Sequence, residues 1–204
     1  MSDICTAKYR ELSNKLASCP SEIGYLMSCF SLSRLNYSYR QNAEQTFPKQ
    51  LINYTHFIDV ALNEILGTTN TNSVSSFLPS ITQMLDHIFE NEGQPFVLEE
   101  ILQCTYKLIT QLNGTTTYSP EITSSIIVSG AQLLLDVVDD YDGVFLQKDM
   151  EHIRQPSNSI LLREILRIDD DLIFLHGLHL QKTSYLALHK RCELYQQIDI
   201  FKGI

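Results

Sequence analysis

Apolar residues recur at intervals of three and four along the middle of the chain, which is the spacing of one face of an α-helix. Four such segments begin with a proline and end at a glycine. Proline fits the first turn of a helix, where its missing N–H has no helical partner, and glycine adopts the left-handed conformation that ends a helix. We therefore predict four helices, over Pro48 to Gly67, Pro79 to Gly93, Pro95 to Gly114 and Pro120 to Gly143.

The fourth segment is apolar on nearly every face. One face carries Ile126 and Leu134, and the opposite face carries Val128 and Leu133. A helix that is hydrophobic all round belongs in the interior of a protein. We predict that Pro120 to Tyr141 is a buried central helix, with Ser119 as its N-cap.

The four segments also suggest an internal repeat of two helices each, over residues 48–93 and 95–143. The second helix of each unit begins with the pattern P-x-I-T, at Pro79 and at Pro120. Repeats of this length are typical of HEAT and armadillo arrays. Any two capped helices share a proline, a leucine and a glycine, however, so an ordinary bundle is the preferred interpretation of the pattern.

The flanks of the chain have weaker periodicity. We expect helices over residues 3–18 and 21–35, a polar connector over 36–47, and a short helix over 144–154. Ser157 or Asn158 is expected to cap a helix that begins with ILLREILRI, and a last helix is expected over 183–201. The predicted fold is all-α: one domain over 1–204 with seven to nine helices, either a bundle or a short HEAT-like array. Its sub-units would be 1–47, 48–143 and 144–204.

Composition narrows the class of protein. The 204 residues are 44% hydrophobic and carry a formal net charge of -9. The apolar content supports a packed core, and the negative charge disfavours nucleic acid as a partner. The longest apolar tract, Ile122 to Leu135, is interrupted by serines and by Gly130, so we expect no membrane span.

Five cysteines at wide spacings form no metal or redox motif, and the N-terminal residues do not resemble a signal peptide. We therefore expect free thiols and an intracellular, cytoplasmic protein. Cys29 and Cys104 lie on apolar stripes and are expected in the core, whereas Cys192, next to Arg191, is expected to be a surface thiol.

The stretch DDDLIFLHGLHL, Asp169 to Leu180, comes nearest to a chemical site. On a helix, Asp169 and His176 would share a face and His179 would lie nearby, which is a conceivable metal site. Leucines and isoleucines occupy that same face, however. A helix start in which the aspartates cap free N–H groups is the preferred interpretation.

A second acidic cluster follows the fourth segment. Read as a calcium loop, it places Asp140, Asp142 and Gly143 at positions three, five and six, but Val138 offers no ligand at position one. Alternatively, Asp136, Asp139 and Asp140 share one helix face and would hold magnesium in an all-α enzyme. The preferred interpretation is a solvated helix end.

Three histidine–carboxylate pairs at a spacing of three are interpreted as weak surface pairs: His56 with Asp59, His87 with Glu90, and Asp149 with His152. The sequence contains no phosphate-binding, dinucleotide, nucleophile-elbow or zinc-protease motif.

We therefore predict a non-enzymatic protein–protein interaction module, an adaptor or regulator that presents a helical groove or face. It would have no cofactor and no resident metal, its protein partner is not specified by the sequence, and it would be compatible with a homo-oligomer. The alternatives are a divalent-metal-dependent all-α enzyme that uses residues 136–142, and a helical protein that binds an apolar ligand.

Overall fold

The computed structural model describes residues 3–47, 51–68, 73–91, 95–140 and 160–200, with the side chains of 3–6, 9 and 135–140 left out. Within these residues the chain forms eight α-helices, two short 3₁₀ helices and no strand, which confirms the all-α prediction. The helices are α1 (Asp3–Ala17), α2 (Ser21–Thr46), α3 (Tyr54–Ile65), α4 (Leu78–Glu90), α5 (Phe96–Leu112), α6 (Pro120–Asp140), α8 (Ile160–Gly177) and α9 (Tyr185–Tyr195). The 3₁₀ helices are η1 (Val74–Phe77) and η3 (Lys182–Ser184).

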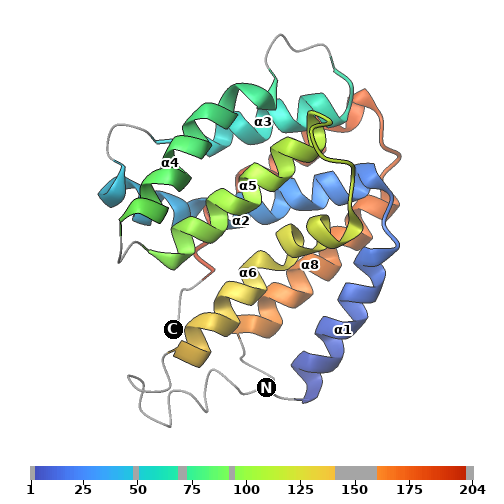
Figure 1. The fold of residues 1–204 in the computed structure, drawn as a ribbon. Helices are drawn as coiled ribbons and strands as arrows, with labels where there is room; N and C mark the ends of the chain where they lie inside the picture. Colours follow the sequence, from blue (N-terminus) through green and yellow to red (C-terminus); the bar gives the residue numbers. More distant parts are fainter. Residues whose placement is uncertain (1–2, 48–50, 69–72, 92–94, 141–159, 201–204) are drawn as a thin grey trace.

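Helix α2 is the centre of the bundle. It packs against α3, α5, α6, α8 and α9, while α1 covers α6 and α8, and α4 covers α5. Figure 1 shows α2 and α5 crossing the middle of the molecule, with α3 and α4 on one side and α6, α8 and α1 on the other. A single hydrophobic core runs from α1 to α9.

The central position of α2 differs from our prediction, which gave it to α6. Helix α6 is buried along Ile126 to Leu134 except at Gln132, and it packs against α1, α2, α5 and α8, whereas α2 packs against five helices. Much of the buried surface of α2 is polar, which is why its apolar periodicity is weak. Burial of polar groups is tolerated only where they find hydrogen-bond partners.

Serine hydroxyls provide many of those partners within α2. Ser28 and Ser33 each donate to the carbonyl oxygen four residues earlier, at 2.9 Å and 2.8 Å. Ser31 instead donates to the carbonyl of Ile126 on α6, at 2.9 Å. Because the serine side chain is small, these hydroxyls reach a hydrogen-bond acceptor without separating the helices. Helices α2 and α6 therefore pack closely.

Several predicted helix ends are confirmed. Gly67 and Gly114 have φ values of 60° and 73°, the left-handed conformation expected after α3 and α5. Ser119 accepts from the Ile122 N–H at 3.2 Å and so caps α6. Helix α3 begins later than predicted, at Tyr54 and not near Pro48, because Asn53 caps it through the His56 N–H at 3.1 Å.

Two predictions about the flanks are wrong. The expected polar connector over 36–47 is helical, since α2 continues to Thr46. The acidic triplet Asp169–Asp171 is not a helix start, since it lies in the second half of α8. The short helix expected over 144–154 and the caps at Ser157 and Asn158 fall outside the described residues.

The arrangement is a bundle and not an array of equivalent hairpins. Helices α5 and α6 pack as neighbours, but α3 packs mainly against α2 and α9, and α4 packs on α5. The shared P-x-I-T pattern therefore marks two helix starts without marking two equivalent units. Among the helices that the structure describes, none is both long and apolar enough to cross a bilayer.

Candidate functional site: a groove beside residues 51–53

The residues that sequence reasoning singled out do not converge. Asp169 is paired with Lys15 of α1 at 2.6 Å, His176 is exposed in the last turn of α8, and His179 is exposed beyond its end. Among the described residues, no group of three or more His, Cys, Asp or Glu side chains lies close enough together to hold a metal ion.

The acidic cluster after α6 cannot be placed in the same way. Asp136, Asp139 and Asp140 lie on the last turns of α6, but their side chains, and all of Asp142 and Gly143, fall outside the described part of the chain. The magnesium and calcium interpretations of this cluster therefore stay predictions.

The histidines predicted to pair with carboxylates have other neighbours. The His56 ring packs against Phe77 at 5.7 Å, and the His87 ring packs against Phe47 at 5.2 Å. Asp59 instead accepts a hydrogen bond from the hydroxyl of Tyr185. Asp149 and His152 lie outside the described residues.

A buried ion network is the largest polar feature that sequence reasoning missed. The Arg34 side chain of α2 is fully buried, and it binds Glu164 at 2.7 Å and Asp171 at 2.5 Å, both on α8 and both buried. Asp171 also accepts from Arg191 at 2.6 Å and from the Tyr195 hydroxyl at 2.5 Å, both on α9. The network thus joins α2, α8 and α9.

The arginines of this network stay positively charged because of the carboxylates around them. Burial opposes the charge of Arg34, but the coulombic attraction of Glu164 and Asp171 outweighs it and raises the pKa of Arg34. Burial and the neighbouring Asp171 carboxylate raise the pKa of Tyr195.

One sequence signal for the network existed: Arg34 interrupts the apolar surface of a predicted helix, and a buried cation requires a carboxylate. Because every carboxylate of the network is held by a described cation or hydroxyl, we assign it a structural role.

The four cysteines whose side chains the structure describes are also buried. Cys29 and Cys104 are fully buried, as predicted, but Cys192 is also buried, so the prediction of a surface thiol is wrong. Burial raises the pKa of the Cys104 and Cys192 thiols to about 12 in each case. A thiol with such a pKa carries almost no thiolate at neutral pH and is a poor nucleophile.

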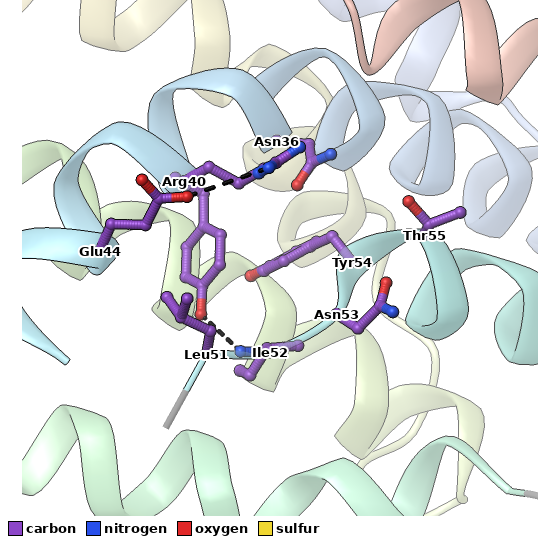
Figure 2. Close-up of a pocket in the computed structure, with 9 residues that line it drawn as sticks. Asn36, Arg40, Glu44, Leu51, Ile52, Asn53, Tyr54 and Thr55 are labelled. Atoms are coloured by element: carbon purple, nitrogen blue, oxygen red, sulfur yellow. Dashed lines mark hydrogen bonds and ion pairs between the residues drawn. The ribbon is translucent and has the colours of Figure 1, made fainter. Parts of the chain in front are cut away.

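Among the described residues, a pair of hollows that meet at residues 51–53 offers a surface for binding. The first, which we call the tyrosine hollow, has a volume of about 380 Å³. It is lined by side chains from the second half of α2 and the start of α3: Asn36, Tyr39, Arg40, Glu44, Leu51, Ile52, Asn53, Tyr54 and Thr55. Figure 2 shows these residues arranged around it.

The second hollow, which we call the phenylalanine hollow, has a volume of about 420 Å³. It shares residues 51–53 with the first and is otherwise lined by His56, Ser76, Phe77, Ser80 and Gln83, from α3, η1 and α4. We refer to the two hollows together as the groove. Leu51, of which 45% is exposed, lies in the wall that they share.

The floor of the tyrosine hollow is rigid. The rings of Tyr39 and Tyr54 pack with their centroids 4.4 Å apart. The Tyr39 hydroxyl accepts from the Ile52 N–H at 2.9 Å, and the Tyr54 hydroxyl is joined to that of Thr105 on α5 at 2.5 Å. Burial raises the pKa of Tyr39 to about 12, so both phenols are neutral at physiological pH. The contact between Tyr39 and Ile52 fixes the 51–53 segment against α2.

The groove has little net charge. Among the described residues that line the groove, Arg40 and Glu44 are the only Asp, Glu, Lys or Arg side chains, and they form an ion pair of 3.9 Å with each other, drawn as a dashed line in Figure 2. The two side chains are well exposed, so the pair is weak and readily opened. Comparison of the chain with protein families, curated proteins and solved structures gave no match, so the groove is interpreted from its own chemistry.

Proposed function

We propose that this protein is a non-enzymatic interaction module, an adaptor or regulator, whose groove binds a polypeptide segment of a partner protein. The observation that carries the proposal is the pair of hollows that meet at residues 51–53. Together they offer two adjacent pockets on one side of the bundle, a shape suited to successive side chains of a bound segment.

The lining chemistry supports a peptide over a nucleic acid or a reacting small molecule. Aromatic rings and amides are enriched at protein-binding surfaces, where they provide contact area and hydrogen bonds without a large cost in entropy. The near-neutral lining would not attract phosphates, in keeping with the chain's net charge of -9. The described thiols next to the core are not activated as nucleophiles.

Selection from a random library of peptides about twelve residues long tests the proposal. Enriched peptides should bind the wild-type protein and lose at least about tenfold in affinity to Leu51→Glu and to Gln83→Arg. The first substitution places a charge in the wall that both hollows share, and the second places one in the phenylalanine hollow. Both positions are exposed, so neither substitution should affect folding.

Leu186→Glu is the matched control. Leu186 lies on α9, is 73% exposed and does not line the groove, so this variant should bind as the wild type does. The proposal is rejected if no peptide is enriched, or if the enriched peptides bind both groove variants as tightly as they bind the control.

A further inference from the structure

We infer that Asn36 recognises the main chain of an uncharged, extended peptide in the tyrosine hollow; the inference rests on the proposed function. Asn36 belongs to the central helix α2 and only 4% of it is exposed. It nevertheless lines the hollow, and Figure 2 shows its carboxamide pointing from α2 toward the start of α3, where Tyr54 and Thr55 lie.

The Asn36 carboxamide makes no hydrogen bond with any described residue, in contrast to the nearby amide of Asn42, which donates to the Ser38 carbonyl at 2.8 Å. The atoms of the Asn36 carboxamide are not among the buried polar atoms that lack a partner, which are Arg34 Nη2, Ser38 Oγ and Gln111 Nε2 in the described part of the chain, so the carboxamide is open to the hollow. Ser28 and Ser33 of the same helix are satisfied by carbonyl groups of α2, whereas the Asn36 carboxamide faces the hollow. A ligand in the hollow would supply the partner that the chain does not.

The chemistry of that partner follows from the carboxamide. Its N–H₂ donates and its C=O accepts, in one plane, and a peptide unit offers the complementary C=O and N–H. A single asparagine therefore forms two hydrogen bonds to one residue of an extended chain, whatever the side chain of that residue. Aromatic rings of Tyr39 and Tyr54 form the floor beneath.

The near-neutral lining gives a strongly charged segment no net attraction. Arg40 and Glu44 compensate each other across the rim, so a charged side chain placed in the hollow would have to compete with that pair. In an extended peptide, side chains alternate in direction and the chain advances about 3.3 Å per residue. Uncharged residues on either side of the one held by Asn36 are thus the segment that fits.

The test uses the tightest peptide from the library selection, synthesised with one backbone N-methyl group at each position in turn. N-methylation removes one N–H donor and leaves the side chain in place. At one position it should weaken binding to the wild-type protein by at least about tenfold, and binding to Asn36→Ala by less than about twofold, because the bond is already lost there. Asn36→Ser is a second variant of the same kind, and Asn42→Ala is the matched control that keeps the wild-type pattern.

A second readout separates ligand recognition from a structural role. Because Asn36 has no partner among the described residues and alanine has a higher helix propensity than asparagine, Asn36→Ala should not lower the thermal midpoint of the free protein while it weakens peptide binding. The inference is overturned if every N-methyl peptide loses the same affinity for the wild type and for the Asn36 variants, or if Asn36→Ala keeps full affinity. If the inference about Asn36 is overturned but peptides still bind and lose affinity to Leu51→Glu, the proposed function stands without that inference. When no peptide binds at all, both fail.

Discussion

At the residue scale, substitution of Asp171 is expected to lower the stability of the protein strongly. It accepts from Arg34, Arg191 and Tyr195 while fully buried. Asp171→Asn would leave two buried or half-buried guanidinium groups without their shared counter-charge. Removing one partner of a buried ion pair costs about 3–5 kcal/mol, so we expect a loss of that size in the free energy of unfolding measured with urea.

Asp170→Asn is the matched comparison that separates the effect of burial from the effect of losing an ion pair with Arg191. Asp170 is the preceding residue and pairs with the same Arg191 at 2.5 Å, but its side chain is 70% exposed. Solvent-exposed ion pairs contribute about 0–1 kcal/mol, so this variant should be close to wild type. Equal losses in the two variants would mean that the Asp171 network does not behave as a buried one.

The same residues show why the sequence pointed to the wrong role for the acidic triplet. Three aspartates followed by an apolar run have the composition of a helix start, and local signals alone favour that interpretation. In the structure the three aspartates form ion pairs with Lys15, Arg34 and Arg191, which are distant from them in sequence. Asn36 was missed for a related reason, because the absence of a partner cannot be seen until the fold is known.

At the element scale, the close approach of α2 to the start of α6 depends on Gly24. A Cβ atom at this position would lie 2.8 Å from the Tyr118 hydroxyl and 2.9 Å from the Thr123 methyl group. We expect Gly24→Ala to lower the free energy of unfolding by about 1–3 kcal/mol, because overpacking outweighs the gain of about 1 kcal/mol in helix propensity. Chemical denaturation measures the difference.

Gly177→Ala provides the opposite case within a helix. It ends α8, and a Cβ there would meet nothing within 4 Å. This variant should be neutral or slightly stabilising, by up to about 1 kcal/mol. If Gly24→Ala proved as harmless as Gly177→Ala, close packing between α2 and the residues around Tyr118 would not limit the stability of the bundle.

Helix boundaries illustrate which part of the fold local sequence determines. Gly67, Gly114 and Ser119 act through bonds to residues a few positions away, so their roles were predicted correctly. The length of α2 was not, because the polar stretch from Asn36 to Phe47 is made helical by tertiary contacts around it. The floor of the groove depends on the same contacts, through Tyr39 and Ile52.

At the scale of the whole molecule, stability should depend strongly on alkaline pH. Burial raises the pKa of Cys104 and Cys192 to about 12, against about 9 for a free thiol, and raises that of Tyr39 to about 12. A group whose pKa is raised by folding favours the folded state below its unfolded pKa, and that contribution is lost as pH rises toward the folded value. Stability should therefore be constant up to about pH 9 and fall between about pH 9 and 12.

The size of the fall can be attributed to single groups. Near pH 11, each of the two thiols should have lost about 2–3 kcal/mol of its contribution, since one pKa unit corresponds to 1.36 kcal/mol. Cys192→Ala should be less stable than wild type at pH 7, because it loses packing, but its unfolding midpoint should fall less steeply with pH. Identical pH slopes for wild type and Cys192→Ala would contradict the enclosed environment of this thiol.

The position of α2 also has a consequence for synthesis on the ribosome. Arg34 is synthesised well before its partners Glu164 and Asp171, which follow 130 and 137 residues later. Until α8 has left the exit tunnel, a nascent chain that collapses around α2 must either hydrate this guanidinium or bury it without a counter-charge. The helix that organises the finished bundle thus cannot complete its packing until α8 has emerged, and a ribosome stalled before residue 160 should display an α2 that proteases still cleave.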